Sequence, residues 1–274
     1  MSEKICLAAM DIDGTLLGKN KNLTDYTIEV LDRAAAAGMH IVIASGRALQ
    51  AIPETLCRVE GIEYVITSNG SSVFSLKNQE RIFEKDMTSE QIMMILDFYR
   101  NYECPMEIFI KGIPYTSEEY FRFPERFGAF GSAAEYVKTT RNPVKDIRAF
   151  AVEHKDEIEG INFIMNHMEL KTEMREKLEA MGGIYVTSSV PRYIEISHGD
   201  VCKYAALKWL ANELNICPEE IIAFGDGEND LEMIQYAGIG VAMENGIDRL
   251  KKAADRIAPS CDENGVARVL EEFL

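Results

Sequence analysis

The stretch Lys4–Leu17 reads KICLAAMDIDGTLL. Its first half, Lys4–Met10, is a short and nearly continuous apolar run, the pattern of a β-strand buried on both faces. The run stops at Asp11, and Asp13 follows two residues later, so both carboxylates leave the strand at the same end. Gly14 then allows the backbone to bend close to a ligand. The stretch predicts a buried strand that delivers two acidic side chains to one edge of a sheet.

Further buried strands, separated by helices, are expected along the chain. Thr24 can cap a helix that stops at Gly38, and a second helix is expected over Ala48–Val59, with Pro53 at the start of its main portion. The alternation predicts a parallel sheet with right-handed crossovers, followed by a hairpin over Ser71–Phe83. The other predicted buried strands are His40–Ala44 (HIVIA), Tyr64–Thr67 (YVIT), Glu220–Phe224 (EIIAF) and Ile239–Met243 (IGVAM).

The composition of the chain changes between residues 85 and 188. This segment is rich in Met, Phe, Tyr and Glu and mixes helix-like stretches with short strands, which indicates an inserted α+β domain. The parallel pattern is expected to resume near Tyr193. The predicted fold is therefore α/β, with a Rossmann-like parallel-sheet core formed by residues 1–84 and 189–274 and an α+β cap formed by residues 85–188.

Charge and composition narrow the range of partners. The 274 residues carry a net charge of −16 at pH 7, which argues against nucleic acid or an anionic membrane as a partner. No apolar run approaches the roughly 18–20 residues that span a bilayer, and the N-terminal residues lack the features of a signal peptide, so we expect a cytoplasmic protein. The six cysteines form no CxxC pair and are expected to be reduced thiols. We expect a monomer or a weak homo-oligomer.

Polar residues follow three of the predicted strands, at Asp11, at Ser45-Gly46-Arg47 and at Gly225-Asp226. Because ligands bind at the carboxyl ends of the strands of an open parallel sheet, we expect these segments to meet at one edge. A lone Asp-x-Asp pair is more often a turn, but here Asp13 joins Asp11 and Asp226 to make a group of three carboxylates. Such a group needs a cation, and an all-oxygen set of ligands suits Mg²⁺.

These residue types fit phosphoryl transfer, which needs a nucleophile, charge neutralisation and a proton for the leaving group. Asp11 is placed to act as the nucleophile and form an aspartyl-phosphate, and Asp13 to act as the acid and later as the base. Ser45 and the Gly46 amide can donate hydrogen bonds to phosphoryl oxygens. Lys203, at the start of a predicted helix, can add a positive charge near the anion.

Five segments carry a resemblance to a known family: Met10–Leu17 (MDIDGTLL), Ala44–Arg47 (ASGR), Val65–Gly70 (VITSNG), Lys203 and Phe224–Asp230 (FGDGEND). In content and order they resemble the haloacid dehalogenase (HAD) superfamily of phosphatases, and specifically its Cof-like subfamily with a type IIB cap. The resemblance covers the whole chain. The insertion between Ser71 and about Ser188 matches the position and size of that subfamily's cap.

The resemblance implies a role for each matching position. Asp11 would ligate Mg²⁺ through its carboxylate and Asp13 through its backbone carbonyl, with Asp226 as the third protein ligand. Asp230 would orient Lys203 or a metal-bound water. The residues implied to hold the phosphate are Ile12 (through its amide), Ser45, Gly46, Lys203 and Asn229, and those implied at the edge of the site are Asn69 and Gly70.

The resemblance implies a magnesium-dependent phosphatase that hydrolyses a small phosphorylated metabolite, either a sugar phosphate or a phosphorylated cofactor. Two alternatives stay open: a phosphomutase that uses the same aspartyl-phosphate, and a non-catalytic sensor of a phosphorylated ligand. A sensor needs no nucleophile paired with an acid, which argues against it. The aromatic segment Tyr115–Phe130 either packs inside the cap or stacks on substrate, and packing is favoured for most of its rings. Arg47 and Arg192 either contact substrate or form ion pairs.

Overall fold

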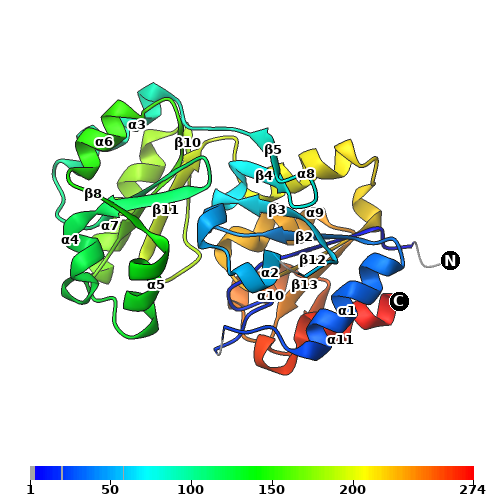
Figure 1. The fold of residues 1–274 in the computed structure, drawn as a ribbon. Coiled ribbons are helices and arrows are strands. Elements are labelled where there is room, and N and C mark those ends of the chain that lie inside the picture. Colours follow the sequence, from blue (N-terminus) through cyan, green and yellow to red (C-terminus); the bar gives the residue numbers. More distant parts are fainter. Residues whose placement is uncertain (1–3, 20, 58) are drawn as a thin grey trace. The chain divides into compact units, whose positions relative to one another are not determined.

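The computed structural model describes residues 4–19, 21–57 and 59–274, so residues 1–3 of the expected core lie outside it. Its elements form two sheets, each with its own helices (Figure 1). Contacts between residues divide the chain into two units. The described residues of the first unit lie within Met1–Gly46, Ile52–Phe83 and Cys202–Leu274, and those of the second lie within Arg47–Ala51 and Glu84–Val201. The domain limits expected after residues 84 and 188 stay a prediction.

The first unit is built on an eight-stranded sheet with β1 near its centre. β1 pairs in parallel with β12 on one side and with β2 on the other, which confirms the predicted parallel core. The expected hairpin is present as β4 and β5, and β4 runs antiparallel to β3. In sheet order the strands are β14 (Arg256–Ala258), β13 (Ile239–Met243), β12 (Ile221–Gly225), β1 (Leu7–Met10), β2 (His40–Ala44), β3 (Ile62–Thr67), β4 (Ser72–Ser75) and β5 (Glu80–Glu84).

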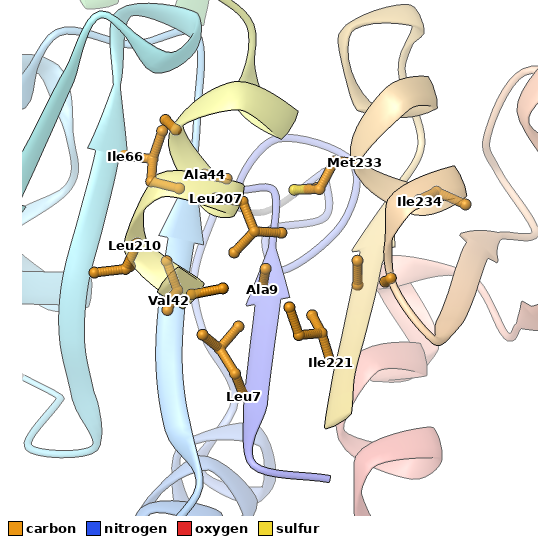
Figure 2. Close-up of a cluster of buried hydrophobic side chains, with 14 of the residues drawn as sticks. Leu7, Ala9, Val42, Ala44, Ile66, Leu207, Leu210, Ile221, Met233 and Ile234 are labelled. Carbon is orange, nitrogen blue, oxygen red and sulfur yellow. The ribbon is translucent and has the colours of Figure 1, made fainter. Parts of the chain in front are cut away.

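Apolar side chains on alternate strand positions form the core of this unit. Leu7 and Ala9 of β1 share one face of the sheet with Val42 of β2, and Leu207 and Leu210 of a helix pack against that face (Figure 2). Burying each of these aliphatic side chains stabilises the folded state by roughly 1.5–3 kcal/mol relative to leaving it exposed. The helices of the unit are α1 (Asp25–Ala36), α2 (Glu54–Cys57), α8 (Lys203–Glu213), α9 (Leu231–Tyr236), α10 (Asp248–Ala253) and α11 (Gly265–Leu270).

Local sequence signals explain where these helices begin and end. The Thr24 hydroxyl accepts a hydrogen bond from the Thr27 amide at 3.2 Å, as expected for the cap of α1. The single helix expected over residues 48–59 is wrong. That segment contains a 3₁₀ turn at Leu49–Ala51 and the short α2, with Pro53 between them, because proline has no N–H to donate and restricts the residue before it. Residue 58 lies outside the described ranges.

The second unit contains a mostly antiparallel six-stranded sheet, in keeping with the expected α+β insertion. Helices α3, α6 and α7 supply Ile92, Ala151 and Met174 to its own apolar core. In sheet order the strands are β10 (Ile184–Thr187), β11 (Tyr193–His198), β9 (Ile158–Ile164), β6 (Met106–Ile110), β7 (Ile113–Ser117) and β8 (Asn142–Val144), and the helices are α3 (Ser89–Tyr99), α4 (Glu118–Arg122), α5 (Ser132–Thr140), α6 (Ile147–Glu153) and α7 (Met168–Met181).

The strand that begins at Tyr193 belongs to the second sheet. The expectation that the parallel pattern resumes near Tyr193 is wrong, because β11 pairs antiparallel with β9 and β10. Ile196 of β11 lies opposite Ile161 of β9, so the apolar face of β11 completes the core of the second unit. Within the described residues, no helix combines the length and the apolar character that crossing a membrane requires.

Candidate active site

The parallel register brings the predicted strand ends together. Met10 lies opposite Phe224, so Asp11 and Asp226 leave β1 and β12 at the same edge of the sheet. The Asp11 amide continues the ladder by donating to the Phe224 carbonyl at 3.1 Å. Ser45 follows β2 at this edge, and its amide donates to the Ile66 carbonyl of β3 at 2.9 Å.

Three carboxylates converge at this edge. Oxygen atoms of Asp11, Asp226 and Asp230 all lie within 4.8 Å of one another. Asp11 is only 7% exposed and Asp230 is fully buried. The side chain of Asp13 is not a member of this group and is exposed to solvent. Among the described residues, the acidic cluster therefore contains Asp230 in the place where the sequence suggested the Asp13 carboxylate.

Lys203 is the cation of the cluster. It is fully buried at the first turn of α8, and its Nζ donates to Asp11 Oδ1 and to Asp230 Oδ1, both at 2.7 Å. The other oxygen of Asp230 accepts hydrogen bonds from the amides of Asp226 (3.0 Å) and Gly227 (2.9 Å). Both oxygens of Asp230 are thus engaged within the protein. This side chain ties α8 to the loop that carries Asp226.

The pKa values in the cluster reflect burial and crowding of like charges. Burial raises the pKa of Asp11 well above its usual range against the opposing effect of Lys203, and the charges of Asp230 and Asp226 add to the rise. Burial likewise raises the pKa of Asp226 to about 7, with Asp230 contributing. Burial acts to lower the pKa of Lys203, but the carboxylates of Asp11 and Asp230 outweigh it and raise that pKa. One ammonium group is therefore shared among three acidic groups.

This arrangement fits a divalent cation. The donors are all oxygen atoms, which hard cations prefer. Burial and mutual repulsion disfavour the charged forms of Asp11 and Asp226, and a cation beside them would reverse both effects. Because Asp230 is occupied by Lys203 and two amides, Asp11 and Asp226 are the carboxylates best able to bind it.

The loop after β1 is a compact turn that holds Asp13. The Gly14 amide donates to the Leu17 carbonyl at 2.9 Å, and the Leu17 amide donates to the Ile12 carbonyl at 2.7 Å. Gly14 has a φ of +83°, in the left-handed region that favours glycine. The hydroxyl of the buried Thr15 donates to Asp226 Oδ1 at 2.9 Å, so this turn contacts the β12 loop directly.

A second pair of loops meets beside the cluster. The Asn69 amide donates to the Ser45 carbonyl at 3.1 Å, and Asn229 Nδ2 donates to Asn69 Oδ1 at 2.9 Å. Asn69 has a φ of +56° and Gly70 a φ of +109°. The Gly70 backbone passes so close to the Cys202 carbonyl that a Cβ would collide with it. Asn69 and Gly70 thus connect the loops that carry Ser45, Asn229 and the start of α8.

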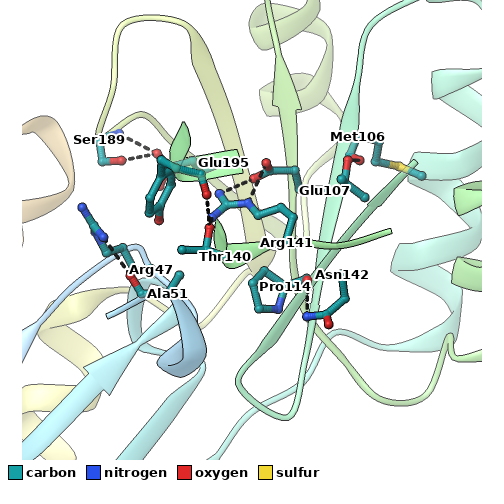
Figure 3. A network of polar contacts seen from close by, with 12 residues as sticks. Arg47, Ala51, Met106, Glu107, Pro114, Thr140, Arg141, Asn142, Ser189 and Glu195 are labelled. Carbon is teal, nitrogen blue, oxygen red and sulfur yellow. Dashed lines mark hydrogen bonds and ion pairs between the residues drawn. The ribbon is translucent and has the colours of Figure 1, made fainter. Parts of the chain in front are cut away.

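The structure groups Arg47 with the second unit. Its Nη1 donates to the Ala51 carbonyl at 2.7 Å (Figure 3). Its guanidinium lies 4.7 Å from the centre of the Tyr136 ring. Arg192 donates to the carbonyls of Phe127 and Gly128 and to the Asn166 side chain. A role for Arg47 at the edge of the site stays a prediction.

The aromatic segment Tyr115–Phe130 contains both packed and exposed rings, and Phe123 is 45% exposed. Tyr120 is buried and packs edge-on against Phe127, and Tyr115 packs against Phe150 of α6. Phe130 is 67% exposed.

Asn245 lies next to the site but was not among the residues predicted from the sequence. Asn245 Nδ2 donates to the Gly14 carbonyl at 2.7 Å, and Asn245 Oδ1 accepts from the Cys261 amide at 3.0 Å. The sequence does contain a signal for its position, because the predicted strand Ile239–Met243 ends directly before Glu244-Asn245-Gly246. Polar residues after a fourth buried parallel strand belong to the same edge of the sheet.

Comparisons with known proteins agree with this geometry. A family model described as haloacid dehalogenase-like hydrolase matches residues 8–270. The Bacillus subtilis (strain 168) protein named "Putative phosphatase YxeH" is 30% identical, and the alignment covers 98% of each chain. The 5-amino-6-(5-phospho-D-ribitylamino)uracil phosphatase YcsE of the same organism is 27% identical, over 98% of this chain and 96% of that protein.

A solved structure also places the fold of this chain among the haloacid dehalogenase-like hydrolases. The structure of a haloacid dehalogenase-like hydrolase from B. subtilis has a TM-score of 0.86 and 26% identity, covering 98% of this chain and 100% of the other. The family match, the relatives and the shared fold together confirm the resemblance drawn from the motifs. The chain therefore belongs to the haloacid dehalogenase-like hydrolases, as a phosphatase of the Cof-like type.

Proposed function

We propose that this protein is a magnesium-dependent phosphatase that hydrolyses a small phosphorylated metabolite through an aspartyl-phosphate on Asp11. The observation that carries the proposal is the buried contact of Lys203 with Asp11 at 2.7 Å, in a cluster that also contains Asp226. A lysine that was only structural would need no third carboxylate beside it. A site for a dianionic phosphate needs the nucleophile, the lysine and a metal cation together.

The reaction we propose has two steps. A carboxylate oxygen of Asp11 attacks the phosphorus atom, and the leaving-group oxygen departs with a proton from Asp13. The Asp13 carboxylate then takes a proton from water, whose oxygen attacks the phosphorus and releases inorganic phosphate and Asp11. The solvent exposure of Asp13 supports this role, because the acid must reach both a leaving group and incoming water.

The other residues bind and orient the phosphoryl group. Mg²⁺, held by the Asp11 and Asp226 carboxylates and the Asp13 carbonyl, would neutralise charge on the phosphoryl oxygens. Lys203 adds a second cation. The proposed hydrogen-bond donors are the backbone amides of Ile12 and Gly46, the Ser45 hydroxyl and the side-chain amide of Asn229. The contact between Asn229 and Asn69 supports its part in this set, because it fixes the orientation of the amide group.

The substrate is proposed by class. Two B. subtilis relatives, 27% and 25% identical, are named as phosphatases of 5-amino-6-(5-phospho-D-ribitylamino)uracil. That compound is therefore the first to test, and hexose and pentose phosphates follow as members of the proposed sugar phosphate class. Phosphate release from a panel of such esters, with Mg²⁺ present, identifies the substrate class. Conversion of one phosphate isomer into another without phosphate release would favour a phosphomutase instead.

The first prediction concerns the nucleophile. The Asp11→Asn variant should lose p-nitrophenyl phosphate hydrolysis by about a thousandfold or more, because an amide cannot attack phosphorus. Removal of Mg²⁺ with EDTA should abolish wild-type activity, and added Mg²⁺ should restore it. The matched control is Asp248→Asn, an exposed residue of α10 paired with Lys251. Near-normal activity of Asp11→Asn would exclude the aspartyl-phosphate mechanism.

A further inference from the structure

Asn245 links three loops around the acidic cluster through the two ends of one amide group. Its Nδ2 donates to the Gly14 carbonyl at 2.7 Å, and its Oδ1 accepts from the Cys261 amide at 3.0 Å. An amide with a donor at one end and an acceptor at the other has only one orientation that satisfies both partners. Although exposed to solvent, this side chain is therefore held in a defined position.

Asn245 holds Gly14, the residue whose backbone angles are least restricted in the turn that carries Asp13. Glycine has a wide choice of backbone angles, so the φ of +83° at Gly14 must be maintained by contacts. The peptide before Gly14 is held by its amide, which donates to the Leu17 carbonyl at 2.9 Å. The peptide after Gly14 is held by Asn245 on its carbonyl side. The first of these two peptides contains the Asp13 carbonyl.

The same short segment also holds the loop that carries Asp226. The Ile247 amide donates to the Asp226 carbonyl at 3.0 Å, and Gly246 lies against the Asp226 backbone closely enough that a Cβ would be crowded. Asn245 and Ile247 thus connect the turn after β1 to the loop after β12. These two segments contain the proposed metal ligands.

We propose that Asn245 is a positioning residue that orients the Asp13–Gly14 backbone relative to Asp226, and so sets the affinity for Mg²⁺ and the placement of the acid. The inference rests on the function proposed above and adds to it a residue outside the motifs. Asn245 acts through Gly14 and does not itself touch the reacting atoms.

The test compares two substitutions at this position. Asn245→Ala removes both hydrogen bonds. Asn245→Asp has nearly the same shape and keeps an acceptor for the Cys261 amide, but it cannot donate to the Gly14 carbonyl. With p-nitrophenyl phosphate and saturating Mg²⁺, both variants should show kcat lowered about tenfold, because small displacements of catalytic groups are costly, while KM stays within about twofold. Glu244→Gln, in the same turn, is the control and should behave as wild type.

A metal-binding measurement accompanies the kinetics. The half-saturating Mg²⁺ concentration should rise about tenfold for Asn245→Ala, since residues that orient metal ligands typically have effects of this size. The shift in melting temperature that Mg²⁺ causes in the wild type should shrink correspondingly, and this shift is measured without substrate.

Two results would overturn the inference. One is a wild-type kcat for Asn245→Asp, which would mean that Asn245 only anchors the Cys261 loop. The other is an unchanged Mg²⁺ dependence of Asn245→Ala, in activity and in melting temperature. Should Asn245→Ala fail to fold, the Asp variant alone decides. If the wild type releases no phosphate from any ester, the proposed function fails, and the melting-temperature shift still tests the link between Asn245 and Mg²⁺.

Discussion

Single residues of the candidate site are constrained most strongly where backbone and carboxylate come into direct contact. Gly14 is such a position, because a Cβ built on it would collide with the carboxylate of Asp226. Its φ of +83° adds strain for any other residue. Gly38 has a similar φ of +88° at the end of α1, but a Cβ there would meet no atom within 4 Å. Comparing the two glycines therefore distinguishes the effect of backbone strain, which both share, from the effect of contact with Asp226, which only Gly14 makes.

We predict different outcomes for alanine at these two glycines. Gly38→Ala should lower the free energy of unfolding by about 1–2 kcal/mol through strain alone and leave kcat unchanged. Gly14→Ala should carry the same strain and also displace Asp226, so phosphatase activity should fall by about a hundredfold or more. Urea denaturation and p-nitrophenyl phosphate kinetics measure both effects. Equal activity of the two variants would show that the Gly14 contact has no part in catalysis.

The residues of the site were predictable from sequence to different degrees. Asp11, Ser45 and Asp226 each follow a buried strand, so the geometry of a parallel sheet places them at one edge whatever the details of the loops. The side-chain contacts within the loops were not predictable in this way. The bond from Asn245 to Gly14 joins positions 231 residues apart, and no local pattern in the sequence records it.

Among the elements, β6 contains an unusual charge. Glu107 of β6 is fully buried and forms two hydrogen bonds with Arg141, at 2.8 and 2.7 Å (Figure 3). Arg141 follows α5 and is only 6% exposed, and its guanidinium also lies 4.5 Å from the centre of the Tyr136 ring. Burying two charges costs several kcal/mol that their attraction has to offset, so removal of one partner leaves the other charge uncompensated.

We predict that Arg141→Met lowers the free energy of unfolding by about 3–5 kcal/mol, because it leaves the Glu107 carboxylate buried without a counter-charge. The double variant Glu107→Met/Arg141→Met should lose less than the single one, since it removes both charges. Lys177→Met, which breaks an exposed pair with Glu173 on α7, should leave the free energy of unfolding nearly unchanged. Urea denaturation followed by far-UV circular dichroism compares the three. A double variant less stable than Arg141→Met would contradict this account.

The sheet to which an element belongs could not always be predicted from the sequence, because strand pairing depends on contacts between distant residues. The sequence was expected to return to the parallel pattern near Tyr193, yet Tyr193–His198 forms a strand of the second sheet. Its partners in β9 and β10 are decided by which apolar face is left uncovered, and the core of the second unit needs Ile194 and Ile196. Strand identity is a local property, whereas strand pairing depends on the whole unit.

At the scale of the whole molecule, each of the two units has an apolar core of its own. The residues proposed to bind Mg²⁺ all belong to the first unit, and the Glu107–Arg141 pair belongs to the second. Trp209 is the single tryptophan of the sequence and lies in α8, where its ring packs 4.9 Å from that of Phe83. Tryptophan fluorescence therefore reports on the first unit, whereas far-UV circular dichroism reports on the helices and strands of both.

Weakening one core should consequently uncouple the two units. In the Arg141→Met variant, the circular dichroism should begin to change at lower urea concentration than the Trp209 fluorescence, because the second unit unfolds while the first is still intact. Mg²⁺ should then shift the fluorescence transition to higher urea and leave the earlier transition in place, since a ligand stabilises only the part that binds it. Coincident transitions that both move with Mg²⁺ would instead show that the two cores unfold as one cooperative unit, with metal binding stabilising the second unit as well as the first.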